Sequence, residues 1–479
     1  MIKALTSIYQ PRFARTIVYM LQATEYQLLP YLKWFWRTSD FSRVMHRRQL
    51  VMTGPARWLL LAMQTGLLLQ YAAGVVFLIW ATDSHSYPLA QLALTLIIIA
   101  PIVWGHLIII PLLLGRWIII NPYNLLQIRH SAQSFADHPG TKIAVAGSYG
   151  KTTMKEILAT VLNEGKKVAA TVANKNVAIS HAQFARSLKG DEEVLIIEFG
   201  EGTPGDVANF CRTTKPDIGV ITGLAPAHLD KYKTLQRAGE DIFSLADFLG
   251  NKNVYVNGES KQLLPFVKKG HLIYSQKEVA DWKISDIKVS ISGLSFKMVK
   301  SGASLQINSH LLGEHQVGPL AAAASIASSL GFTKKQIEEG IARIQPFENR
   351  MQPREAGGAW IIDDTYNGNI EGMLAGLKLL KVLPAKRKIY VTPGLVDQGK
   401  ESSTIHHRLG AAIAEAKPDL VVLMKHSVTD WITAGIRDKG YEGQLVIEED
   451  PLNFYNHLDQ FVAAGDLILL QNDWPDNYQ

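Results

Sequence analysis

The strongest chemical signal in the sequence is a glycine-containing turn that ends in a lysine and two threonines. A buried strand over 142–147 runs into Ser148-Tyr149-Gly150-Lys151-Thr152-Thr153, and a helical run starts at once. Backbone N–H groups at a helix start face anions, a lysine reaches the β- and γ-phosphates, and a threonine hydroxyl ligates Mg²⁺. The strict phosphate-loop pattern is not met, because Val145 replaces its first glycine. A nucleotide site and an ordinary strand–helix turn therefore both remain open.

Further motifs follow in order over some 330 residues, and together they resemble the Mur ligases, which join amino acids or peptides to cell-wall precursors using ATP. The loop resembles that family's nucleotide loop, and Asp363–Asn367 (DDTYN) resembles a form typical of the branch that adds D-alanyl-D-alanine. The other matching segments are Asn174-Lys175-Asn176, Ile196–Gly200 with Gly205-Asp206, Pro216-Asp217 through Ala227-His228-Leu229, and Asn349-Arg350-Met351.

The resemblance implies a reaction in two steps. ATP phosphorylates a substrate carboxylate, and an amine then attacks the acyl phosphate and expels phosphate. Such a reaction needs charge neutralisation and in-line placement more than covalent chemistry from the protein. Lys151 is the implied phosphate cation, and Thr152, Glu198 and His228 are the implied metal ligands, so ATP and Mg²⁺ are the expected cofactors.

The remaining site residues also come from the resemblance. Arg350 and Asp364 would contact the nucleotide from the C-terminal domain, through a guanidinium fork on phosphate and a carboxylate on the ribose. Structural alternatives are an interdomain salt bridge for this pair and helix capping for the loop asparagines. The expected ATP-binding residues are Gly147, Ser148, Tyr149, Gly150, Lys151, Thr152, Thr153, Arg350, Asp364, Tyr366 and Asn367. The expected substrate-binding residues are Asn174, Asn176 and Asp397.

Three departures from the family pattern bear on the site. Gly239 falls where the family carries a carbamylated lysine that ligates a second Mg²⁺, and the hypothesis is that Glu240 or Asp241 supplies the missing carboxylate. The segment His315–Pro319 replaces an H-N-x-x-N helix start, so adenine recognition differs. Residues 471–475 replace a terminal K-G-S.

The N-terminal region carries two long uncharged stretches, Trp58–Ala81 and Pro88–Gly115. Each is long enough to cross a bilayer as a helix, and flanking arginines place both ends in the cytoplasm. The sequence thus predicts a multi-pass inner-membrane protein with cytoplasmic catalytic domains, and membrane lipids as partners. Residues 12–37 are expected either along the inner leaflet or in a packed helical lead-in.

The predicted fold class is α/β. A membrane-associated region, 1–135, contains a two-helix hairpin with spans near 58–81 and 88–115. A phosphate-loop parallel α/β domain with an antiparallel patch near 283–309 covers 139–345, and a smaller doubly wound α/β domain covers 346–479. The membrane segment stands where D-alanyl-D-alanine-adding enzymes have a uridine-nucleotide domain, so a lipid-linked acceptor is a further hypothesis.

Composition excludes several other classes. Residues 1–57 carry nine Lys/Arg against two acids, whereas the rest of the chain is nearly neutral, so a basic body for nucleic acid is not indicated. The single cysteine, Cys211, excludes a disulfide scaffold. The predicted function is an ADP-forming amide ligase that adds D-alanyl-D-alanine or a related amine to a peptidoglycan precursor. The alternatives are an amino-acid ligase on a folate- or polymer-type carboxylate, and a catalytically impaired nucleotide-binding membrane scaffold.

Overall fold

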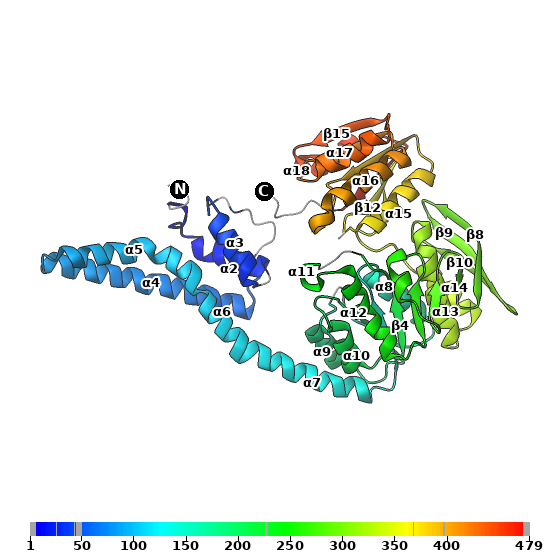
Figure 1. Cartoon of the computed structure of the whole chain (residues 1–479), viewed down its shortest axis with the longest axis horizontal. Helices are drawn as coiled ribbons and strands as arrows, with labels where there is room; N and C mark the ends of the chain where they lie inside the picture. Colours follow the sequence, from blue (N-terminus) through cyan, green and yellow to red (C-terminus); the bar gives the residue numbers. More distant parts are fainter. Residues whose placement is uncertain are drawn as a thin grey trace. The chain divides into compact units, whose positions relative to one another are not determined.

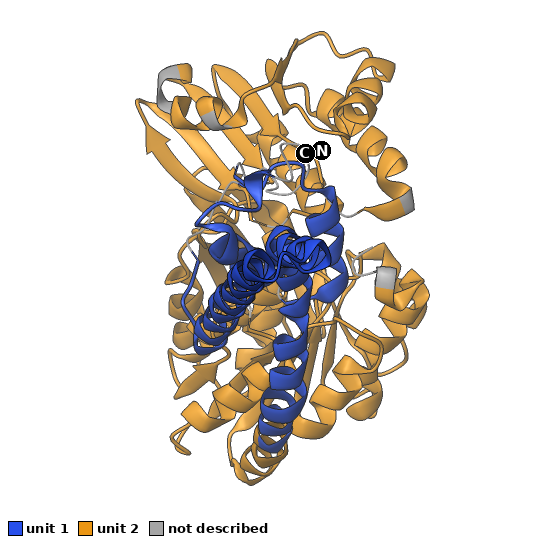
Figure 2. Cartoon of the chain, turned by 90° about the vertical axis from the view of Figure 1, so that its left-hand side faces the viewer, with its two compact units in different colours: residues 1–126 blue, residues 127–479 orange. Residues whose placement is uncertain are grey.

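The computed structural model describes the chain apart from a few short stretches. The described residues are 6–24, 26–42, 44, 50–173, 175–225, 229–366, 368–395 and 398–472. Two compact units emerge from the contacts, Met1–Leu126 and Gln127–Gln479, and they are coloured separately in Figure 2.

The first unit begins with two short helices, α2 (Phe13–Ala23) and α3 (Leu28–Arg37). Their apolar faces share a core with the longer helices that follow, and the Tyr31 hydroxyl donates a hydrogen bond to the Gly105 carbonyl oxygen at 2.5 Å. The structure therefore supports the packed helical lead-in for residues 12–37.

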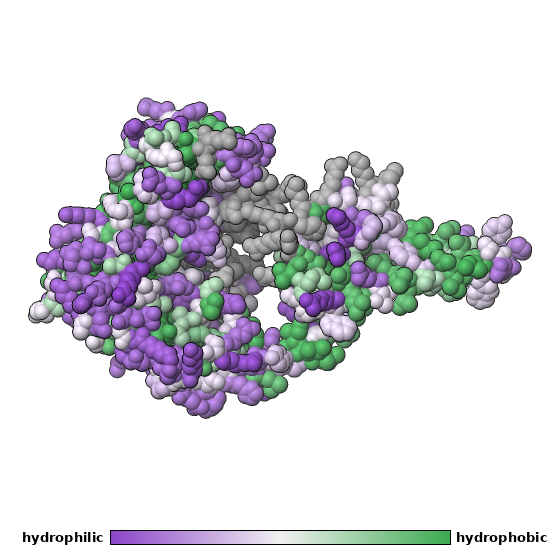
Figure 3. Space-filling model, turned by 180° about the vertical axis from the view of Figure 1, so that it is seen from behind, coloured by the Kyte–Doolittle hydropathy of each residue, from purple (hydrophilic) through white to green (hydrophobic). Residues whose placement is uncertain are grey.

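The two apolar stretches form long helices, α4 (Gly54–Asp83) and α5 (Tyr87–Leu107). Helix α4 and the helical stretch Tyr87–Asp137, which begins with α5, are long and apolar enough to cross a membrane by length and composition alone, a test that core helices of soluble proteins also pass. Hydrophobic side chains remain exposed along this pair (Figure 3). Helix α5 ends at Leu107, and Pro111, in the first turn of the next helix, lacks the N–H that would donate to the Leu107 carbonyl oxygen. The chain continues through α6 (Ile109–Gly115), a π-helical turn (Arg116–Ile120) and α7 (Asn121–Asp137).

A ten-stranded sheet forms the middle of the chain, in the order β10-β9-β8-β7-β6-β5-β4-β1-β3-β2. Its parallel part contains the buried strand predicted over 142–147, as β1, together with five further strands. These strands are β1 (Thr141–Ala146), β2 (Val168–Ala170), β3 (Val194–Glu198), β4 (Ile218–Ile221), β5 (Val254–Asn257) and β6 (Leu272–Tyr274). The predicted antiparallel patch extends the same sheet through β7 (Glu278–Val279), β8 (Trp282–Ser290), β9 (Gly293–Lys300) and β10 (Ala303–Ser309).

Alternating side chains of the central strands build two cores, one on each face of the sheet. Ile143 and Val145 of β1 lie in one core, and Ala144 and Ala146 lie in the other. The first core includes α8 (Lys151–Leu162), α13 (Val317–Ser329) and α14 (Lys334–Ala342). The second includes α9 (Ala178–Ser187), α10 (Asp206–Thr214) and α12 (Leu235–Phe248). Figure 1 shows these helices around the sheet.

The C-terminal region carries a second, six-stranded sheet in the order β11-β12-β16-β13-β14-β15. Its strands are β11 (Gln352–Ala356), β12 (Ala359–Asp364), β13 (Arg387–Thr392), β14 (Leu420–Met424), β15 (Gln444–Glu448) and β16 (Asp466–Gln471). The second α/β domain is thus confirmed. Strand β11 was not predicted, because QPREA lacks apolar alternation; it pairs antiparallel with β12 at the sheet edge. The long helices here are α15 (Ile370–Val382), α16 (Ser402–Ala416) and α17 (Thr429–Asp438).

Candidate functional site

The phosphate loop joins β1 to α8, and two glycines give it its shape. Gly147 has φ of +138°, and a Cβ atom there would lie 2.4 Å from the Thr222 hydroxyl oxygen. Gly150 caps α8 with φ of +75°, a left-handed conformation that glycine adopts without steric cost. The two glycines therefore let the backbone turn sharply before Lys151, the first residue of the helix.

The loop is tied to the end of the neighbouring strand β4. The Ser148 N–H donates to the Gly223 carbonyl oxygen at 2.8 Å, and the Thr222 hydroxyl donates to the Tyr149 carbonyl oxygen at 2.5 Å. The Tyr149 ring lies so close to Gly223 that a Cβ atom there would be 2.2 Å from it. Burial raises the pKa of the Tyr149 phenol. These contacts fix the loop between two strand ends.

Lys151 turns back over the loop instead of pointing into solvent. Its Nζ lies 2.5 Å from the Gly147 carbonyl oxygen and 2.7 Å from Glu201 Oε2. Only 12% of the lysine side chain and 4% of the glutamate side chain are exposed. Thr152 and Thr153 occupy the next two positions of α8, where both are half-buried.

Glu198 ends strand β3 beside the start of α8. Its Oε1 accepts hydrogen bonds from the Thr152 hydroxyl at 3.2 Å and from Asn176 Nδ2 at 3.1 Å. Its Oε2 is buried and accepts no hydrogen bond, although Lys155 Nζ lies 3.5 Å away. The structure thus brings Lys151, Thr152, Asn176 and Glu198 together at the carboxyl ends of parallel strands, where open α/β sheets gather ligands.

Glu198 and Thr152 fit a magnesium ion by the chemistry of their donors. Both offer the oxygen ligands that Mg²⁺ prefers, and the buried Oε2 has lone pairs that no hydrogen bond uses. His228, the third predicted ligand, lies outside the described residues. Among the described residues, no group of three or more His, Cys, Asp or Glu side chains surrounds a possible metal position.

Lys155 is a site residue that the predictions did not include. It is fully buried, and its ammonium group donates to the carbonyl oxygens of Thr171, at 2.8 Å, and Ala173. A fully buried lysine is rare unless it is paired, and here Glu198 is the buried carboxylate beside it. Its place one helical turn after Lys151 was the available signal, because positions i and i+4 share a helix face.

His181 and Glu201 were also missed. The fully buried His181 ring makes a hydrogen bond with the Glu198 carbonyl oxygen through Nε2, at 2.8 Å, while its Nδ1 has no hydrogen-bond partner. Burial lowers the pKa of His181 to about 4, so the ring is neutral at pH 7. Glu201 was hidden because it follows the end of β3, where a sequence pattern does not show which carboxylate turns inward.

The hypothesis that Glu240 or Asp241 replaces the family's lysine carboxylate is not supported. Asp241 Oδ1 accepts from the Gly205 N–H at 2.9 Å, and its Oδ2 accepts from the Tyr232 hydroxyl at 2.7 Å. Glu240 is exposed and pairs with the Gln236 amide. Gly239 itself packs on an aromatic ring, since a Cβ atom there would lie 2.2 Å from Phe266. A lysine at this position requires that ring to move.

Arg350 and Asp364 lie at the edge of the second sheet. The Arg350 guanidinium stacks on the Tyr366 ring, 4.4 Å from its centroid. Asp364 Oδ1 accepts from the Met351 N–H at 3.2 Å, and Oδ2 accepts from Gln471 Nε2 at 2.7 Å. Burial raises the pKa of Asp364 to about 6, although these two hydrogen bonds oppose the rise. The alternative of an Arg350–Asp364 salt bridge is not seen among these contacts, since Asp364 is held by hydrogen bonds and Arg350 by the Tyr366 ring.

Gln471 and Asn472, the described residues of the segment that replaces the terminal K-G-S, make hydrogen bonds at the same edge of the sheet. Gln471 is fully buried between Asp364 and the Tyr390 hydroxyl, which donates to Gln471 Oε1 at 3.1 Å. The Asn472 side chain accepts from the Gly368 N–H at 3.1 Å and donates to the Gly394 carbonyl oxygen. Asn174, Asn367 and Asp397 lie outside the described residues, so their predicted roles stay predictions.

The segment expected near adenine forms a short 3₁₀ turn and the start of α13. The His315 ring lies against Gly313, and the Gln316 amide lies 3.1 Å from His315 Nε2. Burial lowers the pKa of His315 to about 4, so a neutral imidazole stands where the family pattern starts with histidine. Pro319 lies in the first turn of α13, where its missing N–H costs no helix hydrogen bond.

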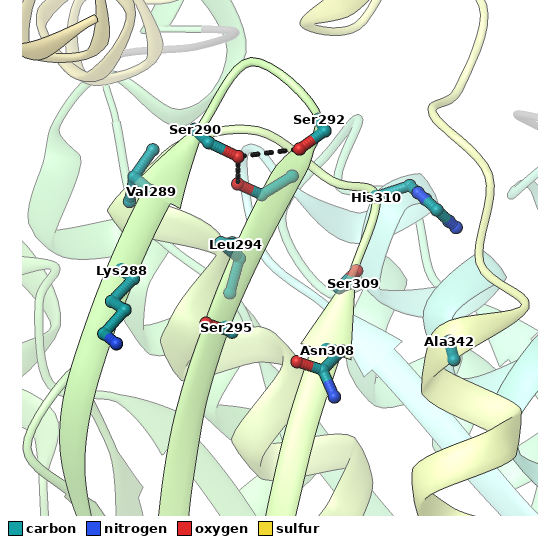
Figure 4. Close-up of a pocket in the computed structure, with 11 residues that line it drawn as sticks. Lys288, Val289, Ser290, Ser292, Leu294, Ser295, Asn308, Ser309, His310 and Ala342 are labelled. Carbon is teal, nitrogen blue, oxygen red and sulfur yellow. Dashed lines mark hydrogen bonds between the residues drawn. The ribbon is translucent and has the colours of Figure 1, made fainter.

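A separate pocket of about 290 Å³ lies among β8, β9 and β10 (Figure 4). The side chains of Lys288 and His310 point in different directions there, and Ser290 hydrogen-bonds to Ser292 at 2.8 Å. None of the predicted site residues lines this pocket. It lacks convergent charges and is not the candidate site.

Comparison with known proteins covers both α/β domains. The family model described as "Mur ligase middle domain" matches residues 145–327, and "Mur ligase, glutamate ligase domain" matches residues 349–471. The chain belongs to the Mur ligase family. The two matches cover the phosphate loop, Glu198, Arg350 and Asp364, but leave residues 1–144 unmatched.

Similar curated proteins are UDP-N-acetylmuramoyl-tripeptide–D-alanyl-D-alanine ligases. The Mur ligase from Buchnera aphidicola subsp. Acyrthosiphon pisum is 28% identical over 282 residues, covering 56% of this chain and 60% of that protein. The Escherichia coli (strain K12) protein is 27% identical over 294 residues, covering 59% of this chain and 64% of that protein. The matches thus span less than two thirds of these relatives.

Solved structures of the same family share the fold. MurF from Acinetobacter baumannii has a TM-score of 0.64 at 21% identity, covering 73% of this chain and 77% of that chain. MurF ligase from Thermotoga maritima in complex with ADP has a TM-score of 0.63 at 23% identity, covering 73% and 80%.

The predicted location is wrong by the same comparison. The sequence predicted a multi-pass inner-membrane protein, but the relatives and solved structures that the chain matches are named as ligases of a peptidoglycan precursor, and none of these names gives a membrane location. The prediction rested on the uncharged stretches within α4 and α5, and these satisfy a membrane-crossing test by length and composition only.

Proposed function

We propose that this chain is an ATP-dependent, ADP-forming amide ligase that adds D-alanyl-D-alanine to the carboxylate of a peptidoglycan precursor. The observation that carries the proposal is the convergence of Lys151, Thr152 and Glu198 at the phosphate loop. The names of the matched D-alanyl-D-alanine ligases support the choice of amine and acceptor.

In this proposal the loop N–H groups and Lys151 bind the nucleotide phosphates from one side. Thr152 and Glu198 would hold Mg²⁺, with His228 as a third ligand by resemblance, and the metal would neutralise phosphate charge. Arg350 would approach the phosphates as a planar fork, and Asp364 would accept a ribose hydroxyl. Tyr366 keeps the Arg350 guanidinium oriented.

The chemistry itself joins two substrates with the loss of phosphate. The substrate carboxylate oxygen attacks the γ-phosphorus, and the bond to ADP breaks. The amine nitrogen then attacks the acyl carbon and releases phosphate and a proton, which forms the amide. The protein's task in both steps is to align the reactants and exclude water, because water would hydrolyse the acyl phosphate.

ADP release by the full-length protein tests the proposal. The substrates are a panel of peptidoglycan precursors, each with and without D-alanyl-D-alanine. We expect ADP release only with both substrates, and Lys151→Ala should lower it by at least about a hundredfold because the phosphate cation is lost. Lys166→Ala, which removes an exposed lysine paired with Glu193, is the matched control and should retain full activity. Nucleotide binding without turnover on every precursor would contradict the ligase function and favour a scaffold.

A further inference from the structure

Lys151 already has an anionic partner at the phosphate loop. Its ammonium group lies 2.7 Å from Glu201 Oε2, and the glutamate side chain is only 4% exposed. Glu201 lies between β3 and α10, only three residues after Glu198. Within the described chain, Lys151 is the one cationic group placed within 4 Å of the Glu201 carboxylate. The lysine that would bind phosphate is therefore neutralised by a carboxylate.

The surrounding charges are paired as well. The fully buried Lys155 side chain places its Nζ 3.5 Å from Glu198 Oε2 and 3.2 Å from Oε1 of the more exposed Glu156. Two buried carboxylates, Glu198 and Glu201, thus face two shielded ammonium groups around one loop. A buried ion pair is strongly destabilised when one partner is withdrawn, because the other is left without compensation.

A nucleotide phosphate cannot take Lys151 without changing this balance. If Lys151 turns to phosphate, Glu201 remains shielded from water beside several new negative charges. A carboxylate in that position needs a cation, and the buried Glu198 Oε2 nearby accepts no hydrogen bond. A divalent cation brought with the nucleotide meets both needs, since carboxylate oxygens are its preferred ligands.

We infer that Glu201 is a resident counter-ion that holds Lys151 until a nucleotide arrives with its divalent cation, and that Glu201 then serves that cation. The inference rests on the proposed function only in that nucleotide phosphates bind this loop. Glu201 thereby makes nucleotide binding depend on metal, because the nucleotide alone must compete with a carboxylate already in place.

Calorimetry on the full-length protein tests this inference with ADP as the probe, once in EDTA and once in Mn²⁺. Glu201→Gln should bind ADP about tenfold more tightly than wild type in EDTA, since the competing anion is gone. The gain in ADP affinity that Mn²⁺ gives should shrink about tenfold in the same variant. Electron paramagnetic resonance of bound Mn²⁺ should show weaker metal binding.

Two further variants make the outcome decisive. Glu193→Gln, which neutralises an exposed carboxylate paired with Lys166, should change neither affinity. Glu201→Asp keeps the negative charge and should keep most of the gain in ADP affinity that Mn²⁺ gives. This variant can be measured even if Glu201→Gln does not fold. Wild-type ADP affinity that is equal in EDTA and Mn²⁺, or a Glu201→Gln affinity unchanged in EDTA, overturns the inference. A wild-type protein that binds no ADP overturns the proposed function instead.

Discussion

The two parallel sheets end in polar clusters of opposite electrostatic character. At the end of β3 and the start of α8, the buried Glu198 and Glu201 carboxylates lie beside Lys155 and Lys151, and Lys155 also pairs with the more exposed Glu156. At the end of β12, Asp364 is matched by the amide of Gln471 and a backbone N–H, and the nearby Arg350 is held by an aromatic ring. The first cluster contains directly paired charges, whereas in the second the direct partners of each charged group are uncharged.

This difference bears on what each cluster can bind. Balanced charges can be redistributed when a phosphate and a metal enter, so the first cluster suits a strongly charged ligand. Uncharged hydrogen-bonding partners suit hydroxyl groups, so the second cluster suits a sugar. One fold principle, polar residues at carboxyl ends of strands, thus produces two kinds of site in one chain.

The largest expected effect on stability comes from removing one charge of the first cluster. Lys155→Met leaves the Glu198 carboxylate buried without its cation, and we expect it to lower the free energy of unfolding by about 3–5 kcal/mol. Urea denaturation followed by circular dichroism measures this. Lys155→Met combined with Glu198→Gln should recover much of the loss, and the exposed control Lys166→Met should lose under about 1 kcal/mol. If Lys155→Met lowers the free energy of unfolding by less than about 1 kcal/mol, the Lys155–Glu198 pair contributes little to stability.

A smaller effect tests the ionisation of Asp364 in the second cluster through the pH dependence of stability. The pKa of Asp364 is about 6 in the folded protein against 3.8 for the free side chain, so the folded state binds more protons between these values. The free energy of unfolding should therefore fall by about 2 kcal/mol as pH rises from about 4 to 6.

Asp364→Asn should lack this fall, and the difference between wild type and variant across pH is the quantity to measure. His181 acts in the opposite direction in both proteins, because its lowered pKa makes stability decrease as pH falls from 6.5 to about 4. Parallel pH profiles for wild type and Asp364→Asn would mean that the Asp364 carboxyl ionises normally.

The smallest effect concerns the arginine at the second cluster. Arg350→Lys and Tyr366→Leu should show a coupling energy of about 0.5–1 kcal/mol in a double-mutant cycle on unfolding, because lysine stacks poorly on a ring. The exposed Arg437→Lys on α17 is the control and should not couple with Tyr366→Leu. Strict additivity of the two substitutions at 350 and 366 would indicate that the stacking contributes nothing to stability.

Much of this arrangement could be predicted from the sequence, because it depends on local patterns. Two short apolar runs mark the strand before Gly147 and the strand that ends at Glu198. Polar residues follow the first run, and they indicate the turn and the helix start at Lys151.

The partners within the site could not be predicted, because they depend on tertiary contacts. Nothing in the sequence shows that Glu201 turns toward Lys151, or that Phe266 fills the space beside Gly239. The hydrogen bonds of Asp241 to Tyr232 and Gly205 could not be predicted for the same reason, and they do not support the hypothesis that this carboxylate replaces the family's lysine. The long apolar helices illustrate a different limit, because length and composition alone do not fix cellular location.

The end of β16 has a practical consequence for anyone who shortens this chain. Gln471 and Asn472 connect Asp364, Tyr390, Gly368 and Gly394, which belong to separate stretches of the C-terminal domain. Truncation before Gln471 would remove all four connections together, and the released loops would become accessible to proteases. Recombinant versions meant for crystallography should therefore keep these two residues and carry any affinity tag beyond them.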